Sequence, residues 1–245
     1  MSPVPGTICL FDVDGTITES RQVIDNDTLQ ALRELSQRVT LGLVGGSDYA
    51  KAIEQLGSVS NCDIFEYVFS ENGLVARRKG EIIAEQNISR FLGEDLVQQL
   101  INYCLGYMSK LELPVKRGTF IEYRSGMINV CPVGRSCSQA ERKQFAAFDA
   151  EHKIREKFVA DLQEKFAGTQ LSFAIGGEIS IDVFPKGWDK TYCLRFLREF
   201  PTIHFFGDKT HPGGNDHEIY TSSRVIGHKV SGPEDTVKQL KELFP

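Results

Sequence analysis

The stretch FDVDGT at residues 11–16 places two carboxylates, Asp12 and Asp14, at the end of a short apolar run. An apolar run such as residues 7–11 is typical of a strand buried on both faces of a parallel sheet. Residues i and i+2 of an extended chain face the same way, so both aspartates point to one spot beyond the strand's end. Two like charges at that spot repel each other, which predicts a cation between them.

The segments around this strand follow an α/β pattern. The predicted elements are a helix at 25–37 capped by Asp25, a strand at 39–44, a helix opened by GGSD at 45–48, a helix at 188–197, strands at 202–208 and near 224–227, and a last helix at 234–243. Alternating strands and helices of this kind predict an open, Rossmann-like α/β sheet.

The pattern changes in the middle of the chain. The predicted elements there are a helix at 94–109, two strand-like segments joined by an SG turn, two helices between 139 and 167, and the strand-like segments LSFAI and ISIDVF. Antiparallel strands with grouped helices predict an inserted α+β domain. We therefore expect an α/β catalytic core over residues 1–84 and 188–245 and an α+β cap domain over residues 85–187.

The composition limits the partners and the compartment. A net charge of −5 and a pI near 5.6 argue against a nucleic-acid partner. No segment approaches the roughly 18 apolar residues of a membrane span, and the N-terminal residues lack the features of a signal peptide. The six cysteines contain no CxxC pair, which favours reduced thiols. We expect a cytoplasmic protein that binds neither membranes nor nucleic acids.

Three strand ends carry polar motifs: FDVDGT, GGSD and GDKTHPGGND at 207–216. Ligands of open parallel sheets bind beyond such ends. Mg²⁺ prefers oxygen ligands, and Asp12, a backbone oxygen near Asp14 and the side chain of Asp208 would supply them. Ser47 precedes a helix start, where free N–H groups favour an anion, and Lys190 would neutralise a phosphoryl group. Each motif alone also fits a simple turn or cap, but together they predict a phosphate-handling site.

These motifs resemble those of a known superfamily. FDVDGT, GGSD, the lysine of GWDK and GDKTHPGGND are similar to the four motifs of the haloacid dehalogenase (HAD) phosphotransferases. In the inserted domain, GTFIEYRSGMINVCPVGRSCSQAER at 118–142 and ISIDVFPKGWDK at 179–190 resemble the eukaryotic phosphomannomutase family. The similarity extends over essentially the whole chain.

The resemblance implies a phosphomannomutase, an isomerase that interconverts mannose 6-phosphate and mannose 1-phosphate for GDP-mannose and glycoconjugate synthesis. Asp12 would be the nucleophile that forms an aspartyl phosphate, and Asp14 the general acid and base. Mg²⁺ would be the cofactor, held by Asp12, Asp14 and Asp208. A hexose 1,6-bisphosphate, of mannose or glucose, would be the intermediate and activator. The family also implies a homodimer formed through the cap domain.

The family further implies a set of substrate contacts. Arg124, Arg135 and Arg142 would hold the phosphate that is not reacting, because guanidinium groups bind phosphate with paired hydrogen bonds. Arg21 would contact substrate from the core, together with Ser47 and Lys190. Ser180 and Asp182, which share one strand face, would bind sugar hydroxyls, with Asn129 as a further candidate. For any single arginine, a solvated surface position is the alternative.

Two other functions fit the same residues. A Mg²⁺-dependent sugar-phosphate phosphatase of the same superfamily would use water as the acceptor, and it has less need of arginines for a second phosphate. A catalytically silent phosphosugar-binding protein would need no nucleophile, so Asp12 and Asp14 count against it. Ser222 stands in the loop where some family members have an acidic residue, so we do not expect a second cation.

Overall fold

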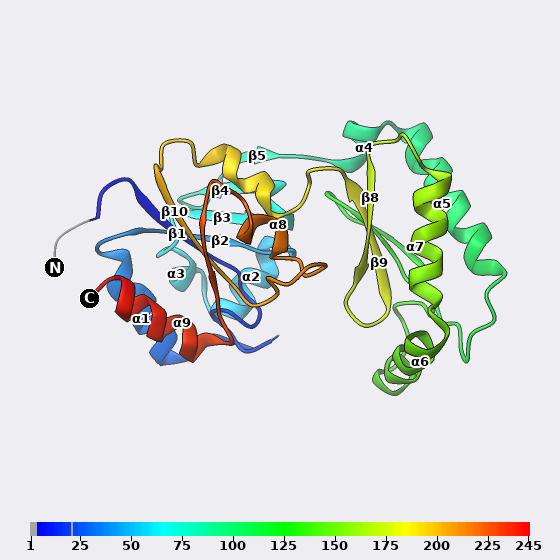
Figure 1. Cartoon of the computed structure of the whole chain (residues 1–245), viewed down its shortest axis with the longest axis horizontal. Helices are drawn as coiled ribbons and strands as arrows, with labels where there is room; N and C mark the ends of the chain where they lie inside the picture. The colour runs from blue at the N-terminus through cyan, green and yellow to red at the C-terminus, as the bar shows by residue number, and fades with distance from the viewer. Residues whose placement is uncertain (1–3, 21) are drawn as a thin grey trace. The chain divides into compact units, whose positions relative to one another are not determined.

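The computed structural model describes residues 4–20 and 22–245, and it divides the chain into two compact units (Figure 1). Unit 1 comprises the chain up to Glu85 and from Gly187 to Pro245, and unit 2 is the inserted segment Gln86–Lys186. Arg21, predicted to contact substrate, lies outside the described residues. Among the described residues, no helix combines the length and the apolar character needed to cross a membrane.

Unit 1 is built on a seven-stranded sheet with the order β11-β10-β1-β2-β3-β4-β5. The strands are β1 (Thr7–Phe11), β2 (Thr40–Val44), β3 (Tyr67–Ser70), β4 (Val75–Arg78), β5 (Glu81–Glu85), β10 (Thr202–Gly207) and β11 (Ile226–Lys229). Strands β11 through β3 run parallel, and β4 and β5 extend the sheet antiparallel. The predicted open α/β sheet is therefore confirmed.

Both faces of this sheet are covered. The helices of unit 1 are α1 (Asn26–Ser36), α2 (Tyr49–Leu56), α3 (Val59–Cys62), α8 (His217–Tyr220) and α9 (Pro233–Leu243), with 3₁₀ helices η1 (Glu71–Gly73) and η2 (Lys190–Phe196). Cys9 and Phe11 of β1 pack in the apolar cluster that includes α1 and α9. Ile8 and Leu10 pack in the cluster that includes η2. Alternate residues of β1 thus face opposite helical layers, which explains its wholly apolar sequence.

Unit 2 has a four-stranded antiparallel sheet with the order β6-β7-β9-β8. Its elements are α4 (Ile88–Leu92), α5 (Glu94–Ser109), β6 (Ile121–Tyr123), β7 (Ile128–Val130), α6 (Gln139–His152), α7 (Ile154–Lys165), β8 (Leu171–Gly176) and β9 (Ser180–Pro185). Helices α5 and α7 lie along one face of this sheet (Figure 1). The α+β prediction for the inserted segment is confirmed, and so is the capping box of Ser138 and Glu141 at the start of α6.

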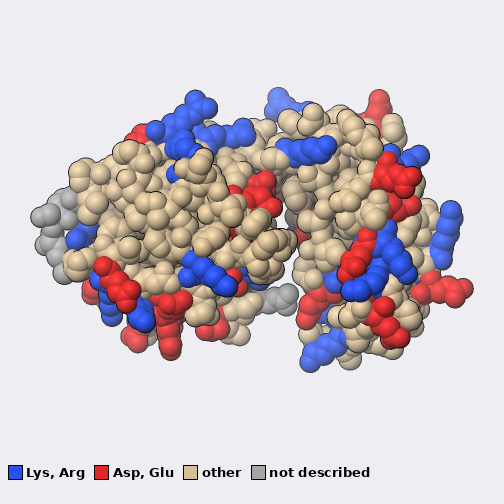
Figure 2. Space-filling view, viewed as in Figure 1, with Lys and Arg blue, Asp and Glu red and all other residues tan. Residues whose placement is uncertain are grey.

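The surface of unit 2 carries charges of both signs. Around α5 and α7, Lys and Arg side chains are interspersed with Asp and Glu (Figure 2).

Some elements differ from the predictions. The expected helix at 188–197 is the 3₁₀ helix η2, and β11 begins at Ile226 rather than near residue 224. Strands β3, β4 and β5 were not predicted. β5 reads EIIAE, whose two adjacent isoleucines give no alternation, and both of them are about half exposed. A strand at the edge of a sheet does not need the period-2 pattern that marks a half-buried strand.

Candidate active site

The strand register brings two sequence motifs together at the carboxyl edge of the unit 1 sheet. Phe11 of β1 pairs with Phe206 of β10, and the Asp12 N–H donates to the Phe206 carbonyl at 3.0 Å. Gly207 and Asp208 follow directly on the neighbouring strand. FDVDGT and GDKTHPGGND therefore meet although almost two hundred residues separate them in the sequence.

A buried lysine links the two motifs. The Lys190 ammonium, 1% exposed, donates to Asp12 Oδ1 and, at 2.6 Å, to Asp216 Oδ1. Asp216 Oδ2 also accepts the Lys209 N–H at 3.0 Å. Burial raises the pKa of Asp12 to about 6, against the opposing charge of Lys190. Burial lowers the pKa of Lys190, but the two carboxylates outweigh it and hold that pKa above its usual value, so the ammonium stays charged.

Three carboxylates of this site can bind one cation. Asp12, Asp208 and Asp216 each present an oxygen, and these oxygens lie within 4.8 Å of one another. Asp208 Oδ1 is buried and has no hydrogen-bond partner among the described residues. An all-oxygen set with an unsatisfied carboxylate suits a hard cation such as Mg²⁺. Burial raises the pKa of Asp208.

The turn after Asp12 allows this close approach. Gly15 has φ 75°, and a Cβ at this position would lie 2.6 Å from Asp208 Oδ2. A side chain at this position would therefore force the Asp208 side chain or the turn to shift.

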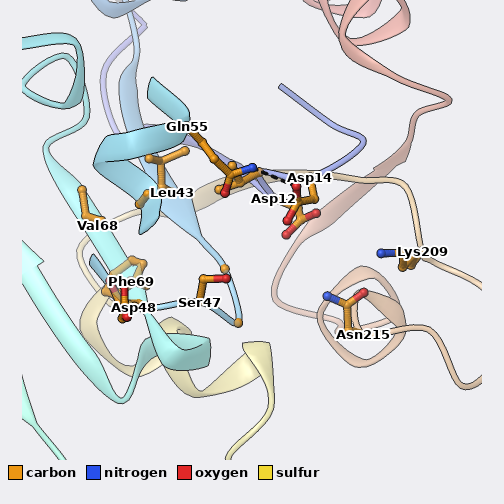
Figure 3. Close-up of a pocket in the computed structure, with 15 residues that line it drawn as sticks. Asp12, Asp14, Leu43, Ser47, Asp48, Gln55, Val68, Phe69, Lys209 and Asn215 are labelled. Atoms are coloured by element: carbon orange, nitrogen blue, oxygen red, sulfur yellow. Dashed lines mark hydrogen bonds between the residues drawn. The ribbon is translucent and has the colours of Figure 1, made fainter. Parts of the chain in front are cut away.

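Asp14 faces a pocket at the same edge of the sheet (Figure 3). The Gln55 side chain of α2, 3% exposed, donates from Nε2 to Asp14 Oδ1 at 2.8 Å. This bond fixes the carboxylate at the pocket wall. The pocket lining includes Asp12, Asp14, Ser47, Gln55, Lys209 and Asn215.

The loop 45–48 forms another wall of this pocket. Asp48 caps α2 by accepting the Lys51 N–H at 2.8 Å, as the GGSD motif predicts for a helix start. The carbonyls of Gly45 and Ser47 accept the N–H groups of Asn72 at 2.8 Å and Glu71 at 2.9 Å. The carbonyls of the loop are thereby held by η1, which suits a loop whose N–H groups bind an anion.

Unit 2 gathers a second polar cluster on its sheet. Glu122, Asn129 and Asp182 occupy directly paired positions on β6, β7 and β9, so their side chains form one row. Asn129 Nδ2 donates to Asp182 Oδ1 at 2.6 Å, and Arg135 Nη1 donates to Asn129 Oδ1 at 2.9 Å. Arg124 and Arg135 both pair with Glu122. Burial raises the pKa of Asp182, partly opposed by Asn129 and the two arginines.

The remaining predicted residues of unit 2 lie beside this cluster or apart from it. Ser180 is buried two residues before Asp182, on the same strand face. Arg142 pairs at 3.8 Å with Glu178, in a different ion pair from that of Arg124 and Arg135. The structure therefore brings together two of the three predicted arginines.

Comparison with known proteins decides the family. The model of the eukaryotic phosphomannomutase family matches residues 27–245. A phosphomannomutase of Glycine max is 58% identical over 240 residues, which are 98% of this chain and 97% of that protein. The chain belongs to the eukaryotic phosphomannomutase family. A phosphomannomutase of Arabidopsis thaliana is 55% identical over 241 residues, 98% of each chain.

Solved structures place this phosphomannomutase family member in the HAD fold. A sugar phosphatase of HAD subclass IIB matches with a TM-score of 0.64 and 17% identity, over 97% of this chain and 98% of the other. A protein related to trehalose-6-phosphate phosphatase matches with a TM-score of 0.60 and 17% identity, over 96% of each chain. At such identities the likeness concerns the fold alone, and it confirms the predicted HAD-type core with an inserted cap.

Several site residues were missed by reading the sequence. Asp216, Lys209 and Asn215 lie inside the quoted motif GDKTHPGGND, but the motif does not tell which of its polar residues turn inward. Gln55 and Glu122 gave no signal, because a single polar residue on a helix or an edge strand is ordinary surface composition. The three side-chain carboxylates that can bind one cation are those of Asp12, Asp208 and Asp216, so the predicted ligand Asp14 is not among them.

Proposed function

We propose that this chain is a phosphomannomutase that interconverts mannose 6-phosphate and mannose 1-phosphate. A hexose 1,6-bisphosphate serves as the intermediate and activator, and mannose 1-phosphate supplies GDP-mannose and glycoconjugate synthesis. The observation that carries the proposal is full-length similarity to proteins named phosphomannomutase, at 55–58% identity. A nucleophile site in unit 1 and an arginine cluster in unit 2 support it.

Asp12 is the proposed nucleophile. Its carboxylate oxygen attacks the phosphorus of a hexose phosphate, an aspartyl phosphate forms, and the bond from phosphorus to the sugar oxygen breaks. A nucleophile must be ionised, and the Lys190 ammonium favours the charged form of Asp12 against the effect of burial. Its hydrogen bond from Lys190 fixes one oxygen of the carboxylate.

Asp14 is the proposed general acid and base. It donates a proton to the departing sugar oxygen, and later it takes the proton of the hydroxyl that attacks the aspartyl phosphate. Gln55 holds Asp14 at the wall of the pocket for both steps.

Cations and N–H donors complete the proposed transfer site. Lys190 stabilises negative charge around the phosphoryl group, and the loop that contains Ser47 supplies hydrogen bonds to it. Mg²⁺ held by Asp12, Asp208 and Asp216, with a backbone oxygen near Asp14, would neutralise charge on the phosphoryl oxygens.

Unit 2 is proposed to bind the rest of the substrate. Arg124, Arg135 and Arg142 bind the phosphate that is not being transferred, and Ser180, Asp182 and Asn129 bind sugar hydroxyls. Arg21 is proposed as a further contact. A mutase needs such donors because its bisphosphate carries one phosphate at each end, whereas a phosphatase needs to hold only the phosphate it removes.

The decisive assay supplies mannose 1-phosphate, Mg²⁺ and a catalytic amount of hexose 1,6-bisphosphate, and it follows mannose 6-phosphate and free phosphate together. We expect mannose 6-phosphate to form without matching phosphate release. Free phosphate at the rate of substrate loss, with no 6-phosphate, would make the chain a phosphatase. Turnover of neither kind would favour a binding protein. Asp12→Asn should abolish both products while the protein stays folded.

Oligomeric state and compartment are further proposals. We expect a homodimer joined through unit 2, as the family resemblance implies, and a sedimentation mass of two chains would support it. A cytosolic position is expected as well, and fractionation of cells that express the chain tests it.

A further inference from the structure

The Glu122 carboxylate forms ion pairs with Arg124 and Arg135, two of the arginines that are proposed to bind phosphate. Glu122 Oε2 accepts from Arg124 Nε at 3.0 Å and from Arg124 Nη2 at 2.6 Å. The same oxygen lies 3.0 Å from Arg135 Nε. Three nitrogens of two guanidinium ions thus lie within 3.0 Å of a single anionic oxygen, and the two of Arg124 donate hydrogen bonds to it.

The sheet holds Glu122 in this position. Glu122 pairs across the strands with Asn129, which pairs in turn with Asp182, so the three side chains stand in one row. Arg135 closes the row by donating to Asn129 at 2.9 Å. Strand register therefore places Glu122 beside Asn129, and the Arg135 side chain contacts both of these residues.

Guanidinium nitrogens surround Glu122 Oε2 as they would surround an oxygen of a bound phosphate. Guanidinium groups bind phosphate through the same paired, charge-assisted N–H bonds that here go to a carboxylate. The side chains of Arg124, Arg135 and Glu122 are each about one-third exposed, so a ligand from solvent can reach them. Because one set of N–H groups cannot fully serve two anions, phosphate and Glu122 compete.

We propose that Glu122 is an internal counter-ion of the arginine pair, which occupies the phosphate-binding N–H groups between substrates and weakens phosphate binding there. The inference rests on the proposed mutase function. A mutase must let go of the distal phosphate so that the bisphosphate can rebind with its ends exchanged. An arginine pair without a competing carboxylate would hold that phosphate too long. Glu122 is then a residue that sets the balance between capture and release.

The test replaces Glu122 by its neutral isostere. In Glu122→Gln, the full-length protein should bind inorganic phosphate and mannose 6-phosphate roughly three- to tenfold more tightly by calorimetry, because a nearby negative charge is removed. In the mutase assay, KM should fall and kcat should fall with it, because release becomes slower. A purely structural role would not lower KM.

Two controls make the result specific. Glu156→Gln removes the same charge from an exposed ion pair of α7, with Lys153 at 3.0 Å, and should leave phosphate affinity unchanged. In an Arg135→Met background, Glu122→Gln should lose most of its effect. Unchanged or weaker phosphate binding by a folded Glu122→Gln protein would overturn the inference, because Glu122 would then only align the arginines. If the wild-type chain shows no mutase turnover, the proposed function fails instead, whichever way the phosphate measurement falls.

Discussion

At the scale of single residues, the site depends on a lysine buried between two carboxylates. The Lys190 ammonium donates hydrogen bonds to Asp12 and to Asp216. Neither the lysine nor Asp216 has appreciable contact with solvent. Removing one member of a buried charge pair leaves the other uncompensated, which is far more costly than losing a surface ion pair.

We therefore expect Asp216→Asn to lower the free energy of unfolding by about 3 kcal/mol and activity by at least about 10²-fold. The Mg²⁺ concentration needed for half-maximal activity should also rise, since one of three carboxylates is lost. Urea unfolding and a Mg²⁺ titration measure the two effects. Asp27→Asn is the matched control at an exposed carboxylate of α1, and its unfolding energy should stay within about 0.5 kcal/mol of wild type. Equal effects of both changes would contradict this role of Asp216.

The residues of this site were only partly predictable. Asp12 and Asp14 could be assigned because they end a strand that the sequence marks clearly. Asp208 likewise follows a strand directly. Asp216 lies eight residues farther on, beyond a glycine-rich loop, and only the conformation of that loop determines that it turns back to Lys190. The position of a residue directly after a strand can be predicted from the sequence, whereas the conformation of a glycine-rich loop cannot.

At the scale of elements, η1 supports the loop 45–48 with a strained backbone. Glu71, Asn72 and Gly73 have φ values of 49°, 62° and 96°, all in the left-handed region that L residues avoid. The N–H groups of Glu71 and Asn72 hold two carbonyls of the loop. Left-handed residues at a ligand site are typical places where strain serves function.

Asn72 offers a clean test of this support. Asn72→Ala should lower the free energy of unfolding by about 1 kcal/mol and raise KM, because alanine tolerates the left-handed region less well than asparagine. Asn72→Gly keeps the backbone conformation without strain and should retain both the unfolding energy and KM. Urea unfolding and steady-state kinetics of the two variants provide the comparison. If alanine and glycine behave alike, the backbone conformation of Asn72 does not matter to the loop.

A histidine pair on neighbouring strands predicts an acid-sensitive element. His204 of β10 and His228 of β11 lie 2.8 Å apart, from Nδ1 to Nε2, and His228 stacks on Phe206. Burial lowers the pKa of His204, and burial together with His204 lowers the pKa of His228 to about 4. The unfolded chain therefore binds protons between about pH 6.5 and 4 that the native state does not bind.

The free energy of unfolding should accordingly fall by roughly 1–2 kcal/mol as the pH drops through this window, a value already reduced for partial exposure of the rings. Above about pH 6.5 the histidine pair should not make the free energy of unfolding depend on pH. His228→Phe retains the ring stack on Phe206 but cannot titrate, so its stability should depend less steeply on pH. Urea unfolding at several pH values measures both slopes, and identical slopes would exclude the pair as the cause.

Elements were predictable where one face of a strand or helix is buried. The strand with Ile128 and Val130 and the strand with Ile181 and Val183 alternate buried apolar with polar residues, so the sequence shows them plainly. β4 and β5 were missed because they form a partly exposed edge of the sheet. β3 is buried at every position, and nothing in its exposure explains why it was missed. η2 was predicted as an α-helix since hydrophobic spacing does not distinguish the two helix types over seven residues.

At the scale of the whole molecule, the proposed function assigns phosphoryl transfer to unit 1 and recognition of the second phosphate to unit 2. Arg135→Gln should therefore lower mannose 1-phosphate turnover by about 10²-fold, whereas hydrolysis of acetyl phosphate, which has no second phosphate, should fall far less. Asp12→Asn should abolish both reactions. Parallel assays of the two substrates give the comparison, and equal losses for Arg135→Gln on both would contradict the assignment.

The insertion of unit 2 between two segments of unit 1 also sets the order in which the two units can fold during synthesis on the ribosome. Unit 2 is complete once Lys186 has been made, whereas β1 must wait for β10, which begins at Thr202. During synthesis unit 2 can thus fold completely while unit 1 is still a sheet of β1 to β5 in which the β1 edge is unpaired. Pairing across such sequence separations is slow and leaves strands open to aggregation. The unpaired edge of β1 is therefore the part of unit 1 most open to aggregation until β10 has been made.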